Sequence, residues 1–467
     1  MQSYYRKGEP LLLKKLYSIE IIDDVEKTIY CPQEIQSLGL THVAFGSFTT
    51  NATFLLHPNG KEDIISISRD LSSQLKLPNQ HVPLHAFSHD GTLSLGPLVG
   101  IFTSGFTPFP LRPIGERSLF FSKLLSVEKS VGAYAFLFGE EHIDWKNGTI
   151  QGLFYNQNGW ETVEVPFPNV IYDRLPNRRS EKKAQASKVK ELLENEYLIP
   201  WYNPGFFNKL DVYEKLLQEE TIARYLPETH PFTSFSLVER MLADYGHVFI
   251  KPFNGSLGLG IHQIIYDREH NHYYCRYRER DGKNKLRKYH TLEALFRHVF
   301  RNRSLSQMLV QQGIHAIKDN KRTVDFRVHT NKDDQGKWHV TAIAAKVSSL
   351  GSVTTHVNNG GVIKTIGEIF ESKEDKNAAI AKLKEACLTL SHSLERQMEG
   401  VIGEIGFDMG IDREGQVWLF EANSKPGRAI FKHPHLKAFD LLTRKLSLAF
   451  SVFLTEKALM SPEEIFK

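Results

Sequence analysis

Residues 403–427, GEIGFDMGIDREGQVWLFEANSKPG, carry the pattern that decides the fold of this 467-residue chain. Two alternating runs flank a polar turn that contains glycine, which predicts a β-hairpin. Asp408 lies on one face of the first strand, and Glu421 and Asn423 share one face of the second. Two carboxylates and an amide oxygen are hard ligands, suited to a Mg²⁺ ion that also holds phosphate oxygens. Polar residues at the rim of a sheet would give the same spacing.

The apolar side chains of this hairpin predict its register. We expect Phe407 and Met409 to stack beside Trp418 and Phe420, because cross-strand pairs of this kind stabilise a sheet. Every register that does so places the two carboxylates on one face, directly opposite each other or one diagonal apart.

A second signal is the run IKPFNGSLGLG at residues 250–260. Lys251 ends an apolar strand before a glycine-rich loop, where a lysine can neutralise phosphate oxygens and glycines let backbone N–H groups approach an anion. The loop lacks the GK[ST] ending of a Walker loop and does not open a helix as a dinucleotide fingerprint does. A protein kinase is excluded because the HRD catalytic loop is absent. Taken alone, the run is equally compatible with a plain β-hairpin turn.

A third signal is the pair Asp325 and Arg327, which share a strand face, with Lys346 at the far end of the same predicted hairpin. Cations placed beside a phosphoryl group stabilise the charge that develops during its transfer. A surface ion pair would explain these residues if they stood alone.

The chain divides into three regions. Residues 1–95 hold short β-branched and aromatic runs between Gly, Asn and Pro, which predicts a small, mainly β module. Strands and helices alternate over residues 96–194, which predicts an α/β domain that ends in a polar connector helix. Residues 195–460 carry the three signals among mixed strands and helices and form the third predicted domain.

Composition excludes several other classes of protein. Lys and Arg number 58 against 54 Asp and Glu, and the formal net charge of +4 is no electrostatic footprint for nucleic acid. The three cysteines are odd in number and far apart, which indicates a reducing compartment rather than disulfides or a zinc cluster. The N-terminus lacks the apolar stretch of a signal peptide, and no segment approaches the ~20 apolar residues of a membrane helix. We therefore expect a soluble, cytoplasmic protein that binds neither nucleic acid nor membrane.

The signals occur in a recognisable order. They are Lys209 before a helix, Lys251 with its glycine loop, VQQGI at 310–314, DFR at 325–327, Lys346, NNGG at 358–361 and the final EANSKPG. This series resembles the ATP-grasp superfamily over about residues 195–435. With LGPLVGIF at 95–102 and the W…FPNVIYDR stretch at 160–174, it is similar to the YheC/YheD endospore coat-associated family over nearly the whole chain.

The resemblance implies an ATP-grasp fold, in which two α+β subdomains clasp ATP, preceded by an α/β pre-ATP-grasp domain and the small β module. It implies ATP with one or two Mg²⁺ ions, or Mn²⁺ in their place. The implied reaction is that of an ATP-dependent ligase, which activates a carboxylate to an acyl phosphate that an amine or thiol then attacks. Its partners would be ATP, an unidentified carboxylate and a nucleophile, and the family implies association with the spore coat. The alternative is a non-catalytic spore-coat structural or binding protein that uses ATP as a ligand.

The resemblance also implies roles for single residues. Contacts to the nucleotide phosphates fall to Lys209 and Lys251, and the mobile loop over ATP contains Gly255, Ser256, Gly258 and Gly260. The hinge strand, whose backbone would bind adenine, consists of Gln311, Gln312, Gly313 and Ile314. The residues near the γ-phosphate and the acceptor are Arg327, Lys346 and Asn358, and the metal ligands are Asp408, Glu421 and Asn423.

Two positions depart from the superfamily's pattern. Glutamines 311 and 312 stand on the hinge strand where many members have a carboxylate, which leaves ribose recognition open. Lys346 stands where arginine is common, so the cation remains without the two-pronged geometry of a guanidinium group.

Overall fold

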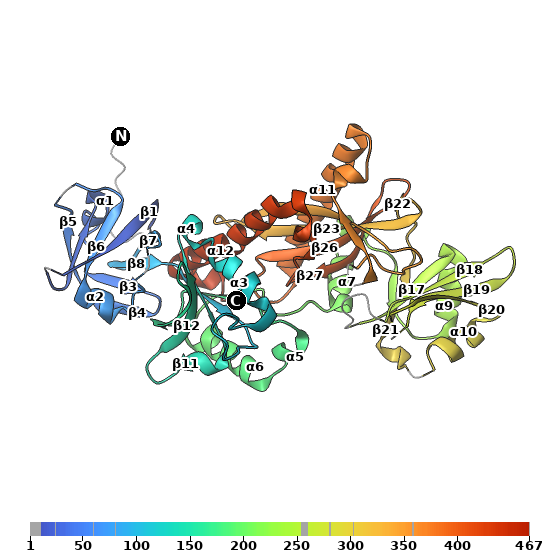
Figure 1. Ribbon diagram of the computed structural model, residues 1–467, viewed down its shortest axis with the longest axis horizontal. Helices are drawn as coiled ribbons and strands as arrows, with labels where there is room; N and C mark the ends of the chain where they lie inside the picture. Colours follow the sequence, from blue (N-terminus) through green and yellow to red (C-terminus); the bar gives the residue numbers. More distant parts are fainter. Residues whose placement is uncertain are drawn as a thin grey trace.

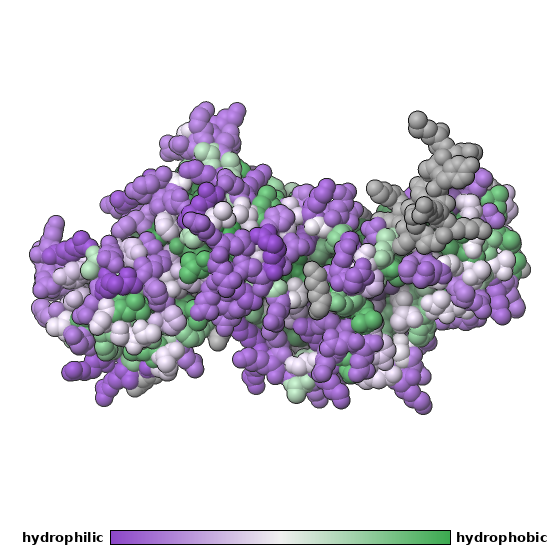
Figure 2. Space-filling view, turned by 180° about the vertical axis from the view of Figure 1, so that it is seen from behind, coloured by the Kyte–Doolittle hydropathy of each residue, from purple (hydrophilic) through white to green (hydrophobic). Residues whose placement is uncertain are grey.

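The computed structural model describes residues 11–466 except 24, 59, 80, 254–259, 280–281, 302 and 357–358. Four β-sheets with their helices follow one another in an elongated molecule (Figure 1). Hydrophilic side chains cover most of the face seen in Figure 2, and apolar side chains show between them in scattered patches. No helix within the described residues is long and apolar enough to cross a membrane.

The N-terminal part forms an eight-stranded sheet in the order β4-β3-β8-β7-β1-β6-β2-β5. Its elements are β1 (Leu11–Ile22), β2 (Thr28–Cys31), α1 (Gln33–Gln36), β3 (His42–Phe45), β4 (Phe48–Asn51), β5 (Thr53–Leu56), β6 (Ile64–Ser68), α2 (Arg69–Gln74), β7 (Leu84–His89) and β8 (Thr92–Gly96). The long strand β1 pairs antiparallel with β7 and then parallel with β6. The short apolar runs of this part therefore form strands, as predicted.

The second sheet is built around the parallel strands β10-β9-β14. Its elements are β9 (Leu98–Phe102), α3 (Ser118–Leu125), α4 (Glu128–Val131), β10 (Tyr134–Phe138), β11 (Ile143–Asp144), β12 (Thr149–Asn156), β13 (Gly159–Pro166), β14 (Val170–Asp173), α5 (Arg178–Glu181), α6 (Ala184–Glu191) and β15 (Trp201–Tyr202). All residues of β9, β10 and β14 are buried, as expected for parallel strands covered on both faces.

The prediction of one connector helix is wrong in detail. The segment forms α5, which begins where Asn177 Oδ1 accepts a hydrogen bond from Ser180 N at 2.9 Å, then α6 and a π-helical turn at Leu192–Glu196. Polar helix-forming residues predict helix here, but composition does not show where one helix ends and the next begins, and only α5 starts with a side-chain cap.

A single hydrophobic core runs through the first two sheets. It includes Val43 and Phe45 of β3 together with Phe136 and Phe138 of β10. Gly46 supports this contact, because a Cβ there would lie 2.4 Å from the backbone oxygen of Phe167. The N-terminal sheet is therefore packed onto the second sheet rather than tethered to it.

The third sheet has the order β16-β21-β17-β18-β19-β20 and is covered by α9 and α10. Its elements are β16 (Thr229–Pro231), α9 (Phe235–Tyr245), β17 (His247–Pro252), β18 (His262–Asp267), β19 (His272–Arg278), β20 (Asn284–Tyr289), α10 (Leu292–Val299) and β21 (Met308–Gln312). Ser234 caps α9 and Thr291 caps α10 with hydroxyl oxygens that accept backbone N–H bonds, and Gly246 ends α9 in the left-handed conformation.

The fourth sheet has the order β25-β24-β23-β26-β27, with β22 paired to β23. Its elements, with the helices around it, are α7 (Lys209–Leu217), α8 (Glu220–Ala223), β22 (Lys318–Asp319), β23 (Arg322–Lys332), β24 (Trp338–Val347), β25 (Val362–Lys364), α11 (Lys373–Gln397), β26 (Glu404–Ile411), β27 (Val417–Asn423) and α12 (Lys437–Met460). Helix α11 packs on this sheet, whereas α12 contacts β23 and β24 as well as α4, β7 and β14 (Figure 1). Helix α12 therefore joins the fourth sheet to the first two.

Candidate functional site

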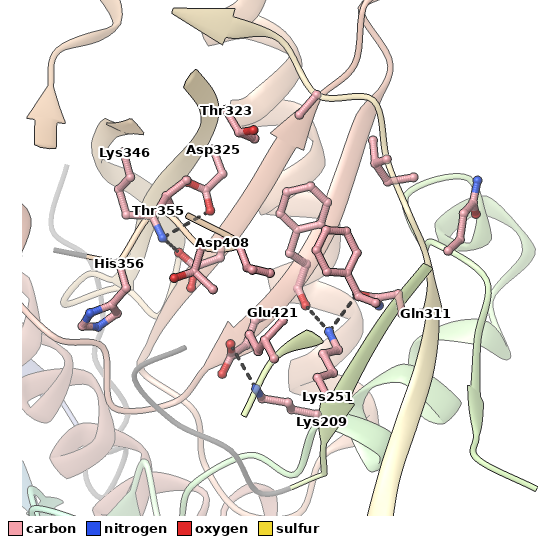
Figure 3. A pocket seen from close by; sticks show the side chains of 18 residues that line it. Lys209, Lys251, Gln311, Thr323, Asp325, Lys346, Thr355, His356, Asp408 and Glu421 are labelled. Carbon is pink, nitrogen blue, oxygen red and sulfur yellow. Dashed lines mark hydrogen bonds and ion pairs between the residues drawn. The ribbon is translucent and has the colours of Figure 1, made fainter. Parts of the chain in front are cut away.

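A cavity of about 170 Å³ lies where the third and fourth sheets meet (Figure 3). It is lined by Lys209, Phe249, Lys251, Ile261, Gln311, Gln312, Ile314, Ala316, Thr323, Asp325, Lys346, Val353, Thr354, Thr355, His356, Asp408, Phe420 and Glu421. Eight of these residues are site residues that were predicted from the sequence, and a ninth, Asp325, belongs to the predicted pair of Asp325 and Arg327.

The hairpin β26–β27 places Asp408 directly opposite Glu421, in agreement with the predicted face. The predicted stacking is wrong beyond that pair, because a β-bulge shifts the register so that Met409 pairs with Leu419 and Phe420 has no partner on β26. Trp418 consequently pairs with Gly410.

The bulge decides which side chains of β27 reach the cavity. Leu419 and Ala422 are buried in the core below the sheet, whereas the consecutive residues Phe420 and Glu421 both line the cavity. Strict alternation would have sent one of these two side chains away from it. The extra residue therefore gives the site an aromatic side chain beside a carboxylate.

Asp408 is held by two cations. Arg327 donates from Nε and Nη2 to the two carboxylate oxygens at 3.0 and 2.8 Å, and Lys346 Nζ donates to Oδ1 at 2.7 Å. Burial raises the pKa of Asp408, but the charges and hydrogen bonds of Arg327 and Lys346 outweigh it and hold that pKa well below its usual range. Asp408 is therefore ionised at neutral pH.

Asp325 pairs with Lys346 across β23 and β24, as the predicted hairpin required, and its Oδ2 lies 3.5 Å from Lys346 Nζ. Its Oδ1 atom is buried without a hydrogen-bond partner among the described residues. Burial raises the pKa of Asp325, and the negative charge of Asp408 adds to that rise. This carboxylate has room for one further donor or cation.

The opposite wall carries Lys251 and Gln311. Lys251 Nζ donates to Gln311 Oε1 at 2.8 Å and to the backbone oxygen of Phe420 at 3.4 Å. Gln311 Nε2 donates to Thr229 Oγ1 at 2.8 Å. The Gln311 side chain is thus committed to Lys251 and Thr229.

Burial, together with the charge of Lys209, lowers the pKa of Lys251 to about 7. Lys209 opens α7, whose N-cap Asn208 accepts backbone N–H bonds from Leu210 and Asp211, and its Nζ lies 3.4 Å from Glu421 Oε2. The Lys209–Glu421 ion pair therefore lies beside Lys251 on one side of the cavity (Figure 3).

The predicted hinge strand is β21 with the residues after it. Gly313 is required there, because a Cβ would lie 2.0 Å from the His247 ring, and its N–H donates to the His247 backbone oxygen at 3.0 Å. Gln312 Oε1 accepts from the N–H of Glu228 at 3.0 Å. The N–H of Ile314 meets no acceptor within the described part of the chain, and Ile314 lines the cavity.

Several predicted residues lie elsewhere. Asn423 follows Glu421 on the same face but does not line the cavity, and its Nδ2 is 3.4 Å from the Gly406 oxygen, which leaves Oδ1 for a ligand. Gly260 has φ +76° and its oxygen lies 2.9 Å from His262 Nδ1. The remaining loop and acceptor residues lie outside the described residues, namely Gly255, Ser256, Gly258 and Asn358.

The carboxylates that would hold a metal ion are already paired with cations, Asp408 with Arg327 and Lys346 and Glu421 with Lys209. Among the described residues no group of three or more His, Cys, Asp and Glu side chains could hold a metal. Asp408 faces Glu421, and the unpartnered Oδ1 of Asp325 adds a buried acceptor nearby. Hard oxygen donors beside a phosphate-sized cavity suit Mg²⁺, which commonly binds through one or two carboxylates together with substrate phosphates.

The sequence signals missed some lining residues. Phe249 precedes Lys251 by two residues and so shares its strand face, which the alternation could have shown. Thr355 and His356 come from the segment before NNGG and carry no pattern that marks them.

The amino-acid sequence is similar to a known protein family and to two named relatives. The family described as YheC/D like ATP-grasp matches residues 198–454. Endospore coat-associated protein YheD of Bacillus subtilis (strain 168) is 42% identical over 453 residues, 97% of this chain and 99% of YheD. Endospore coat-associated protein YheC of the same organism is 22% identical over 272 residues, 58% of this chain and 73% of YheC.

Among solved structures, the VanG D-Ala:D-Ser ligase from Enterococcus faecalis is 13% identical and aligns with a TM-score of 0.45 over 77% of this chain and 99% of that one. The predicted ATP-grasp fold is confirmed by the family match, and that fold implies ATP binding. Over nearly its full length, therefore, this chain belongs to the YheC/D-like ATP-grasp family.

Proposed function

We propose that this protein is an ATP-dependent ligase that joins a carboxylate to an amine or thiol through an acyl phosphate. One observation carries the proposal. Asp408 and Glu421 stand opposite each other and both line the cavity. Lys209, Lys251 and Lys346 line it too, and Arg327 is bonded to Asp408.

In the proposed reaction, a carboxylate oxygen of the substrate attacks the γ-phosphorus of ATP and ADP leaves. The nucleophile then attacks the acyl carbon, and inorganic phosphate leaves while the nucleophile loses one proton. The protein contributes positioning and charge neutralisation rather than a covalent intermediate of its own.

Residues on both walls of the cavity would contribute to the proposed reaction. Lys209 and Lys251 would neutralise phosphate oxygens, and the N–H of Ile314 would donate to adenine. Arg327 and Lys346 would stabilise charge that develops on the phosphoryl group. Mg²⁺, when bound by Asp408, Glu421 and Asn423, would supply further positive charge at the phosphates.

A second candidate is a non-catalytic binding protein of the spore coat, as the names of YheD and YheC suggest. It is favoured by the state of Asp408, whose two oxygens are already taken by Arg327 and Lys346. A site that neutralises its own carboxylate can bind a nucleotide without consuming it.

Hydroxylamine distinguishes the two candidates. The protein is incubated with Mg-ATP, a panel of carboxylates and hydroxylamine, and a ligase gives a hydroxamate with ADP and phosphate. Glu421→Gln should abolish the product, whereas Glu414→Gln, an exposed neighbour in the turn of the same hairpin, should not. Nucleotide that stays intact over the whole panel supports the binding protein, and AMP with pyrophosphate contradicts the acyl-phosphate route.

A further inference from the structure

Buried ion pairs join the second sheet to the fourth. Glu404, the first residue of β26, accepts hydrogen bonds through Oε1 from the Tyr172 hydroxyl and from Arg174 Nη1, both at 2.5 Å. Its Oε2 lies 3.9 Å from Arg428 Nη2. The Glu404 side chain is 2% exposed, and the two arginines are 11% and 10% exposed.

Positive charge exceeds negative charge among these pairs. Arg428 also pairs with Asp440 at 3.2 Å, and Asp440 pairs with Arg444 as well. The guanidinium groups of Arg174, Arg428 and Arg444 therefore share two carboxylates. Removing a charge from water without full compensation is costly, so this arrangement favours an additional anion.

Arg117 adds a further positive charge to the same place. Its Nη1 donates to Thr103 Oγ1 at 2.9 Å, and the Thr103 hydroxyl donates to the Arg174 backbone oxygen at 3.0 Å. Its Nη2 donates to the Ser104 backbone oxygen, and its guanidinium carbon lies 5.4 Å from the centre of the Phe121 ring. Among the described residues no ion pair joins it to a carboxylate. Burial, together with the nearby charge of Arg174, lowers the pKa of Arg117 to about 10.

An aromatic ring and an unpaired donor complete the cluster. The guanidinium carbons of Arg174 and Arg428 lie 5.1 and 5.8 Å from the centre of the Phe120 ring. His329 is 1% exposed, and its Nε2 has no hydrogen-bond partner among the described residues. His329 pairs with Gly406 on β26, midway between Asp408 and Glu404. Buried polar atoms without partners are rare and mark places where a ligand or water is missing.

We propose that Arg117, Arg174 and Arg428, the junction arginines, bind an oxyanion of the ligase's own substrate, a carboxylate or a phosphate remote from the reacting end. The inference rests on the proposed function, since it extends the same reaction to a second contact with the substrate. It goes beyond the cavity, whose lining contains none of the three arginines.

The spacing of residues along β23 indicates how long such a substrate would be. Arg327 contacts Asp408 at the cavity, and Asn331, four residues further along β23, pairs with Glu404. Four residues of strand span about 13 Å. The substrate is therefore an elongated acid with a second anionic group on the order of 10 Å from its reacting carboxylate, such as a short peptide or a long dicarboxylate.

The test measures how fast Arg117 is chemically modified in the full-length wild-type protein without nucleotide. An arginine-selective dicarbonyl reagent is applied in chloride, inorganic phosphate, a short dicarboxylate or a long dicarboxylate at equal ionic strength, and modified arginines are mapped by mass spectrometry. We expect an oxyanion, and not chloride, to slow modification of Arg117 about tenfold, a factor typical of losing one hydrogen bond to a charged group. Protection by the long dicarboxylate or by phosphate identifies which oxyanion is preferred.

A variant pair repeats the measurement by binding. Arg117→Met should weaken the anion-dependent rise in melting temperature, whereas Arg413→Met, an exposed arginine in the β26–β27 turn, should leave it unchanged. Equal modification of Arg117 in every salt, or equal responses of the two variants, overturns the inference. The Mg-ATP melting shift is recorded on the same samples. A nucleotide response without an anion response rejects the junction site and leaves the proposed ligase standing. An anion response in a protein that gives no hydroxamate keeps the anion site but rejects its assignment to a ligase substrate.

Discussion

The lysine at the end of β17 is the residue most sensitive to its surroundings. Burial, together with the charge of Lys209, lowers the pKa of Lys251 to about 7. Above that pH the folded protein has released a proton that the unfolded chain keeps up to the ordinary lysine pKa of ~10.4. The free energy of unfolding should therefore rise with pH between these two values, and Lys251 contributes this slope.

ATP binding should return to Lys251 the proton that this side chain releases in the folded protein. A phosphate beside Lys251 favours its charged form, so ATP binding above pH 7 should take up close to one proton and should weaken as the pH rises. Titration calorimetry at pH 8 in buffers of different ionisation enthalpy measures the uptake directly. Lys251→Met should remove it, while the exposed Lys384→Met serves as a control that keeps it. Uptake that persists in Lys251→Met would assign the proton to another group.

The role of Arg327 can be separated from that of Lys251. Arg327 pairs with Asp408 and does not line the cavity wall that holds the hinge. We expect Arg327→Met to lower kcat about 10²–10³-fold, as removal of a transition-state donor does, with a much smaller change in the Kd of ATP. Arg327→Lys should recover part of kcat. Equal losses in kcat and in affinity would show that Arg327 acts in ground-state binding.

At the scale of elements, the β-bulge in β27 depends on a glycine in the facing strand. Gly410 leaves room for the Phe420 ring, and a Cβ at position 410 would lie 2.3 Å from Phe420 Cζ. Gly410→Ala should lower the free energy of unfolding by about 1–3 kcal/mol through overpacking, measured by urea denaturation. It should also push the ring into the cavity and weaken ATP binding.

Two further variants check this explanation. Gly410→Ala combined with Phe420→Leu should recover much of the lost stability, because the smaller side chain vacates the contact. Gly427→Ala should change little, since nothing lies within 4 Å of a Cβ there. If the double variant is as unstable as Gly410→Ala alone, the glycine serves some purpose other than the ring.

The β26–β27 hairpin also shows which features of the site could be predicted from the sequence and which could not. Alternation placed Asp408 and Glu421 on one face, and pair register confirms that they face each other. The same alternation put Phe420 on the wrong face, because one unpaired residue inverts every side chain beyond it. A bulge of one residue depends on contacts with Gly410 and Lys251, and such contacts between distant segments have no local signature. The ion pairs of Glu404 with Arg174, 230 residues away, escaped prediction for the same reason.

At the scale of the whole molecule, helix α12 holds sheets together. Leu448 is fully buried in a core that also contains Val99 of β9, Leu137 of β10 and Tyr202 of β15. Leu448→Ala should destabilise the protein by about 2–5 kcal/mol, the usual loss for a buried leucine. Because the core is shared, hydrogen exchange should become faster in both β10 and β24. Phe439→Ala, on the same helix but 43% exposed, should leave exchange in both strands nearly unchanged. Faster exchange confined to one sheet would show that the sheets unfold separately.

The distribution of cores limits how the chain can move. One core runs through the first two sheets, a second binds α12 to both the second sheet and β7, and ion pairs fix the fourth sheet to them. The core under α9 and α10 is made only of residues from the third sheet and its own helices. The four sheets therefore form two groups, and the cavity lies between them. If the protein closes on a ligand, the part that these cores leave able to move is residues 229–312 against the rest of the described chain.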